Sequence, residues 1–162
     1  MATPAMPSSG ARALHPRDVD RLCAIDRAYT GHSRRGFFER RLKAAAVCPN
    51  DFILVGVVRG GSLRGYAVAR LLRGEFGQAD VKAVLDAIGV EPECQERGVG
   101  QSLMDELIDI MRRRGVRTLH SQANWADHGL LRFFHACGFE LSPRLVLERP
   151  VAEPLAEAAA EP

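Results

Sequence analysis

The segment Gln95-Glu96-Arg97-Gly98-Val99-Gly100 has the residue types and spacing of an anion-binding turn. It lies between an apolar stretch that predicts a strand over residues 79–90 and an amphipathic stretch that predicts a helix over residues 101–114. Glycines let a backbone approach a ligand closely, and a helix N-terminus presents free N–H groups to a phosphate or pyrophosphate. The G-x-G-x-x-G spacing of dinucleotide sites is absent. The segment therefore predicts a site for another phosphate-bearing ligand.

Asp86 is the candidate general base, because it is the only ionisable residue in the apolar part of the strand that precedes the turn. The alternation of a strand predicts that Val84, Asp86, Ile88 and Val90 share one face. A lone carboxylate in apolar surroundings holds a proton more readily, which suits a base near neutral pH. The alternative for Asp86 is a structural bond to a neighbouring loop or arginine.

Composition excludes several other classes of function. The 162 residues are 46% hydrophobic and 26% charged, with a net charge of +2, as in ordinary soluble proteins that do not bind nucleic acid. No apolar run reaches the roughly 20 residues of a membrane helix, and the first ten residues lack the pattern of a signal peptide. We therefore expect a cytoplasmic protein without a membrane partner. The four cysteines are scattered without metal-ligand spacing, so no metal is expected.

The order of predicted elements indicates one α/β domain over residues 11–149, with disordered ends at 1–10 and 150–162. Two helices follow a short strand at 11–14, and a Gly60-Gly61 turn joins strands 52–58 and 63–72. After the helix at 101–114 come a strand at 117–123, a helix at 127–136 and a strand at 139–148. The hairpin requires antiparallel strands and the helical crossovers require parallel ones, so we predict a mixed sheet with helices on both faces.

Two motifs at this spacing resemble those of the GNAT superfamily of N-acetyltransferases. Gln95-x-x-Gly98-x-Gly100 resembles the acyl-CoA-binding motif, and residues 131–139 resemble the family segment that ends in aromatic-x-x-x-Gly-Phe. The resemblance covers about residues 11–149. It implies a three-layer α/β/α fold with a central mixed sheet of about six to seven strands.

The resemblance also implies acetyl-CoA as the acyl donor, bound in an opening between the strands at 79–90 and 117–123. The pantetheine arm would bond to the backbone near Ile88 and Val90, and the pyrophosphate would lie on the amides of residues 97–101. Asn124 ends its strand where the family often has a ligand-contacting Asn, although Asp127 falls at that position when counted from Gly138. The residues expected at the donor site are Ile88, Val90, Gln95, Arg97, Gly98, Val99, Gly100, Gln101, Asn124, Asp127 and Phe134.

By resemblance, the reaction is direct attack of a primary amine on the thioester. Asp86 stands where several family members have a catalytic Glu. Phe134 occupies the position of the Tyr that often protonates the leaving thiolate, so His120 or an ordered water is the expected substitute. The alternative function, favoured by Phe134, is a catalytically weak acyl-CoA sensor or regulatory module.

The acceptor is expected to be an amine of a small molecule or a protein, bound near the first two helices. Tyr29, Arg34 and Arg35 are the candidate acceptor-binding residues, since the two arginines could hold a carboxylate or phosphate. A solvated helix face is the alternative for this charge cluster. The frequency of dimers in the family leaves a homodimer open.

Overall fold

The computed structural model describes residues 10–74 and 80–151. Its five-stranded sheet has the order β1-β2-β3-β4-β5, with β1 at Ala11–Ala13, β2 at Phe52–Arg59, β3 at Ser62–Leu72, β4 at Lys82–Val90 and β5 at Thr118–Ser121. Neighbours from β1 to β4 are antiparallel, whereas β4 and β5 are parallel. The mixed sheet is therefore confirmed. The predicted ends at 1–10 and 150–162 fall almost wholly outside the described residues.

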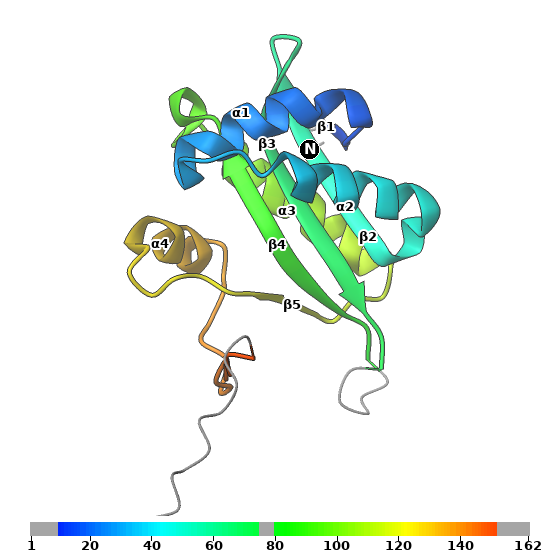
Figure 1. Ribbon diagram of the computed structural model, residues 1–162, viewed down its shortest axis with the longest axis vertical. Helices are drawn as coiled ribbons and strands as arrows, with labels where there is room; N and C mark the ends of the chain where they lie inside the picture. The colour runs from blue at the N-terminus through cyan, green and yellow to red at the C-terminus, as the bar shows by residue number, and fades with distance from the viewer. Residues whose placement is uncertain (1–9, 75–79, 152–162) are drawn as a thin grey trace, which may run out of the picture.

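Helices cover both faces of the sheet, as expected (Figure 1). Helices α1, Val19–Thr30, and α2, Arg35–Val47, cross one face, and α3, Val99–Arg113, lies behind the other. Helix α4, His128–Ala136, follows β5, and short 3-10 turns stand at Pro16–Asp18 (η1), Pro49–Asp51 (η2) and Pro92–Cys94 (η4). None of the helices in the described part of the chain is long and apolar enough to cross a membrane.

The sheet separates two hydrophobic cores. On the α3 face, Leu103, Leu107 and Met111 of the helix pack on strand residues such as Val55 and Leu85. The leucine spacing of α3 predicted this buried stripe. On the other face, side chains of α1 and α2 pack on β3, with Leu22, Ile25, Phe38, Tyr66 and Val68 in the cluster. Strand β4 therefore lies between α1 on one face of the sheet and α3 on the other. The predicted donor site is at the end of this strand.

The predicted sheet of six to seven strands is wrong for the described residues, which form five. The missing strand is the one expected at 139–148, where the chain has no regular structure and no sheet partner in the described part. Beyond Phe139, its large apolar side chains are exposed, with Leu141 98% and Leu147 87% accessible. A strand needs a paired neighbour and a packed face to be stable, and this segment has neither.

A β-bulge at Asp86 overturns the predicted common face of Val84, Asp86, Ile88 and Val90. Val68 of β3 lies opposite Ala87, but the next β3 residue lies opposite Leu85, so Asp86 is an extra residue in β4. Beyond the bulge, Ala87 packs in the core under α1 and α2, whereas Ile88 and Val90 pack against the α3 core. An inserted residue of this kind reverses the alternation of a strand.

Candidate functional site

The turn before α3 has the backbone expected of an anion site. Gly98 adopts a left-handed conformation, φ 76°, as the N-cap of the helix, which begins at Val99 rather than at residue 101. The backbone N–H and hydroxyl of Ser102 both donate to the Gly98 carbonyl, at 2.9 and 2.8 Å. The amides of Val99, Gly100 and Gln101 belong to the first turn of the helix, where no intrahelical acceptor exists. They are therefore available to an anion.

Gly100 has a packing role that the sequence did not indicate. A Cβ atom at this position would lie 2.8 Å from Cε2 of the Phe133 ring, so only glycine leaves room for α4 to pack on the start of α3. At Gly98, by contrast, a Cβ atom would meet nothing within 4 Å, and the positive φ alone favours glycine. The two glycines of the motif thus serve different purposes.

Arg59 contacts the turn, although the sequence analysis gave it no role. Its guanidinium donates to the Arg97 carbonyl at 3.0 Å from the end of β2. The 38-residue separation hides this contact from local pattern analysis, since it depends on how α3 and its preceding turn pack across β2. Arg59 therefore adds positive charge beside the predicted anion site.

The end of β4 has a free backbone edge. The Glu91 N–H donates to the Arg64 carbonyl of β3 at 2.8 Å, which fixes the direction of the ladder. Because adjacent strand residues point their backbone groups to opposite sides, the N–H and C=O of Val90 point away from β3. Strand β5 pairs with β4 only from Lys82 to Leu85, so it has diverged before Val90. This is the predicted opening between the two strands.

Tyr29 and Gln95 meet at this free edge. The Tyr29 hydroxyl donates to the Val90 carbonyl, and the Gln95 side-chain amide donates to the same hydroxyl at 2.5 Å. Burial raises the pKa of Tyr29 above its ordinary value, against smaller opposing effects of these two hydrogen bonds. The structure thus places Tyr29, which was predicted to contact the acceptor, beside predicted donor-site residues.

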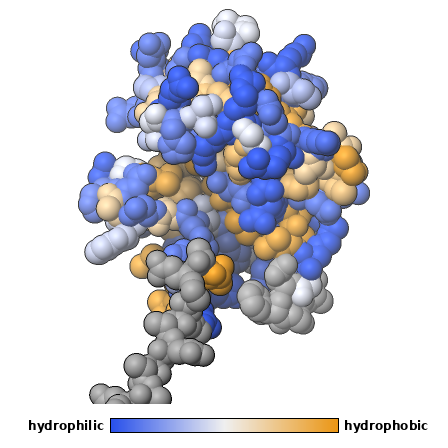
Figure 2. Space-filling view, in the orientation of Figure 1, coloured by the Kyte–Doolittle hydropathy of each residue, from blue (hydrophilic) through white to orange (hydrophobic). Residues whose placement is uncertain are grey.

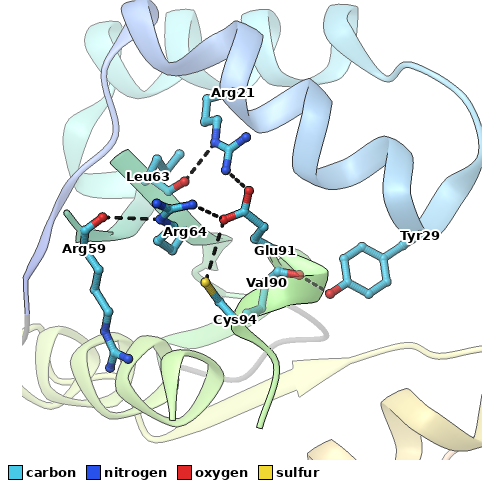
Figure 3. A network of polar contacts seen from close by, with 8 residues as sticks. All are labelled: Arg21, Tyr29, Arg59, Leu63, Arg64, Val90, Glu91 and Cys94. Atoms are coloured by element: carbon cyan, nitrogen blue, oxygen red, sulfur yellow. Dashed lines mark hydrogen bonds and ion pairs between the residues drawn. The ribbon is translucent and has the colours of Figure 1, made fainter. Parts of the chain in front are cut away.

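A network centred on Glu91 ties the turn to α1 and β3 (Figure 3). Its carboxylate accepts from Arg21 of α1 and from Arg64 of β3, the latter at 2.5 Å, and Cys94 donates to it at 3.7 Å. Hydrogen bonds from Arg64 and Arg21 lower the pKa of Glu91. Sequence reasoning missed this network, because the partners come from three separate elements. It fixes the end of β4, from which the predicted anion-binding turn continues.

Asp86 is engaged by two arginines. Arg70 Nε lies 2.9 and 2.7 Å from its two carboxylate oxygens, and Arg41 of α2 lies 2.9 Å from one of them. These partners place Asp86 on the face covered by α1 and α2, with 10% of its side chain exposed. The arrangement matches the structural alternative, an aspartate bonded to arginine. It leaves the Asp86 carboxyl group one residue beyond the last β4–β5 pair.

His120 lies on the same face as Asp86. It stands opposite Val84 of β4, and its neighbour Leu119 packs against the α3 core, so alternation directs His120 to the other face. Its Nε2 atom is buried without a hydrogen-bond partner in the part of the chain that the structure describes. Burial lowers the pKa of His120, with smaller contributions from Arg144 and Lys82. The two predicted catalytic residues thus lie on neighbouring strands where these strands diverge.

Arg34 and Arg35 are both held in ion pairs. Arg34 makes two hydrogen bonds to the buried Asp26 of α1, at 2.8 and 2.5 Å, and the Tyr66 hydroxyl donates to the same carboxylate at 2.7 Å. Arg35 bonds to Asp20 and, at 3.4 Å, to Glu39. The sequence prediction did not anticipate these intramolecular partners, which occupy the charges proposed for an acceptor.

The remaining predicted residues have local structural contacts. Asn124 Oδ1 accepts from the Ala126 N–H at 2.9 Å, and Asp127 Oδ1 accepts from the Leu130 N–H at 3.0 Å as the cap of α4. Phe134 is buried, with its ring centroid 4.7 Å from that of Phe139. In Figure 2, hydrophobic side chains are visible between α4 and the body of the molecule.

Comparisons with known proteins agree with this architecture. Residues 19–139 match the model of the acetyltransferase (GNAT) family. The ribosomal protein bS18-alanine N-acetyltransferase of Escherichia coli K12 is 26% identical over 83 residues, 51% of each chain. Serotonin N-acetyltransferase 2 of rice is 31% identical over 67 residues, 41% of this chain and 32% of the relative. The chain thus spans about half the length, or less, of these curated relatives.

Solved structures with the same fold share little sequence with the chain. An integron cassette protein from a salt-marsh metagenome superposes with a TM-score of 0.72 at 21% identity, over 90% of this chain and 92% of the other. The aminoglycoside N-acetyltransferase AAC(6')-Iy, solved with CoA, superposes with a TM-score of 0.68 at 18% identity, over 86% and 98%. These likenesses establish the fold.

Proposed function

The chain belongs to the GNAT family of acetyltransferases, and we propose that it transfers an acetyl group from acetyl-CoA to a primary amine by direct attack. The observation that carries this proposal is the free edge of β4 at Val90, which leads into the amides at the start of α3. The strand edge offers backbone N–H and C=O groups, and the start of α3 offers N–H groups alone. An elongated ligand with amide groups at one end and a pyrophosphate at the other would pair with both.

The donor would bond through its pantetheine amides to the backbone of Ile88 and Val90, which the divergence of β5 leaves unpaired. Its pyrophosphate would lie on the amides of Val99, Gly100 and Gln101. Arg59 and Arg97 would add positive charge at that end. Tyr29 now bonds to the Val90 carbonyl, so it must share or yield that acceptor when pantetheine binds.

The reaction forms a C–N bond and breaks the C–S bond. An ammonium acceptor loses one proton to solvent before attack and a second as the amide forms, and the leaving thiolate gains one. Both oxygens of Asp86 are held by arginines, and we therefore assign Asp86 to position Arg70 and Arg41 beside the acceptor rather than to act as the base. His120, neutral near pH 7 because its pKa is lowered, would take the proton. That proton would then pass from His120 to the leaving thiolate, a step for which Phe134 has no hydroxyl.

The second candidate is an acyl-CoA-binding module with little turnover. The observation in its favour is Phe134, whose side chain is buried among aromatic rings and has no hydroxyl. Such a module would use the same donor site. It differs from the enzyme because the bound thioester would not be transferred to an amine.

Two measurements on the full chain test the proposal. Binding of acetyl-CoA should raise the melting temperature, and CoA should be released when amines are added. Gly98→Asp would place a negative charge at the turn and should weaken binding at least tenfold. Gly115→Asp makes the same change at a similar φ, +71°, beyond the other end of α3, and serves as the matched control. Binding without release for any amine would favour the module, and no binding would refute both.

A further inference from the structure

A cationic groove lies apart from the donor site. It has a volume of about 740 Å³ and lies between the C-terminal half of α2, η2 and the last residues of β3. We call it the α2–β3 groove and define it by its four cationic residues, Arg40, Lys43, Arg70 and Arg73. Val47 adds an apolar wall, and Figure 2 shows hydrophobic side chains at that end of α2.

The charges of the α2–β3 groove are only partly balanced. Arg73 lies 3.7 Å from Asp51, the one acidic residue in the lining, and Arg70 bonds to Asp86. Arg40 and Lys43 have no acidic partner within residues 10–74 and 80–151, and both are exposed. A concave surface with several cations concentrates anions and repels polycations. The groove is therefore suited to a carboxylate-bearing ligand.

Arg70 connects the α2–β3 groove to the proposed reaction site. It lines the groove and bonds to Asp86, and in the sheet it stands opposite Val84, which in turn stands opposite His120. Neighbouring strands are about 4.8 Å apart, so the wall at Arg70 is about 10 Å from β5. A ligand anchored in the groove would reach the divergence of β4 and β5 across about 10 Å.

We propose that the α2–β3 groove binds the acidic part of the acceptor, a peptide with a free amino terminus and a carboxylate side chain about three residues away. Extended residues span about 3.3–3.6 Å each, so three residues cover the separation. This inference rests on the proposed function, since it names the acceptor class of the same site. It disfavours polycationic acceptors, which Arg40 and Lys43 would repel, since neither has an acidic partner among the described residues.

The test compares three hexapeptides with free amino termini that differ only at the fourth residue, which is Glu, Gln or Lys. CoA release by the full chain should give the highest kcat/KM for the Glu peptide, about tenfold above the Gln peptide, with the Lys peptide lowest. Added salt should shrink these differences, since exposed charges are screened. The double variant Arg40→Glu/Lys43→Glu should reverse the order, and Arg40→Gln/Lys43→Gln should flatten it.

Arg112→Glu is the matched control, because Arg112 is an exposed arginine on α3, the opposite face of the sheet. It should keep the wild-type order of the peptides. Equal kcat/KM values for all three peptides would refute the proposal that the α2–β3 groove binds the acceptor. The same holds if Arg40→Glu/Lys43→Glu keeps the wild-type order of the peptides. Acetylation of small amines without any peptide activity would also refute it and leave the proposed function standing. Absence of CoA release with every amine would refute both.

Discussion

The ring of Phe133 lies against Gly100, so that a Cβ atom on the glycine would come within 2.8 Å of the ring edge. This contact joins the first turn of α3 to α4 across 33 residues of sequence. The second glycine of the motif is therefore needed by the protein's own packing, whether or not a ligand also approaches it. A substitution at Gly100 should therefore lower the free energy of unfolding even when no ligand is present.

Gly100→Ala should lower the free energy of unfolding by about 1–3 kcal/mol, the usual cost of overpacking a filled site. Gly129→Ala is the control within α4, because its Cβ atom would meet only Asp127 Oδ1, at an ordinary 3.6 Å. That control should be neutral or stabilising, since alanine favours helix. Urea denaturation of both variants measures the difference. A Gly100→Ala protein as stable as wild type would contradict the packing role.

Asp26→Asn should destabilise the protein by about 3–5 kcal/mol, because it leaves the Arg34 guanidinium without its buried anionic partner. Arg35→Ala, which breaks only exposed ion pairs, should cost much less. Denaturant unfolding near pH 7 checks both values. Equal small losses in the two variants would show that the contacts of Asp26 add little.

The same pair has a defined pH dependence. Burial raises the pKa of Asp26, but hydrogen bonds from Arg34 and Tyr66 more than offset this and leave the pKa lowered. Its contribution is therefore present above the ordinary pKa of aspartate, about 3.9, and is lost as pH falls through the lower folded value. The gap in stability between wild type and Asp26→Asn should narrow in acid. A gap that stays constant down to acid unfolding would contradict this linkage.

Local patterns predicted the elements around the site better than they predicted the contacts inside it. The apolar run and the glycines located β4 and the start of α3, since these features depend on neighbours in sequence. The bulge at Asp86 was missed because one inserted residue reverses a face without changing local composition. The bonds of Arg34 to Asp26 and of Arg59 to Arg97 depend on how distant elements pack, which spacing alone does not reveal.

His120 should make stability depend on pH near neutrality. Its pKa is lowered in the folded state, mainly by burial, so the unfolded chain binds the proton more readily. Stability should therefore fall as pH drops through the ordinary histidine value, about 6.5, toward the folded value, and should change no further from this source below it. His120→Gln should remove that component in unfolding curves between pH 8 and 5. His135→Gln is the control in α4, and an identical pH slope in both variants would contradict the assignment.

Tyr29→Phe should separate catalysis from binding at the free edge of β4. The variant keeps the ring but loses the hydroxyl that donates to the Val90 carbonyl and accepts from Gln95. Because the hydroxyl lies at Val90, between the proposed positions of the pyrophosphate and the sulfur, it does not reach the leaving thiolate, and kcat should stay close to the wild-type value. The dissociation constant for acetyl-CoA should stay the same or decrease, because the Val90 carbonyl becomes free. Steady-state kinetics with calorimetric binding measure the two effects, and a fall in kcat of about 10² or more, the usual contribution of a general acid, would contradict this placement of the hydroxyl.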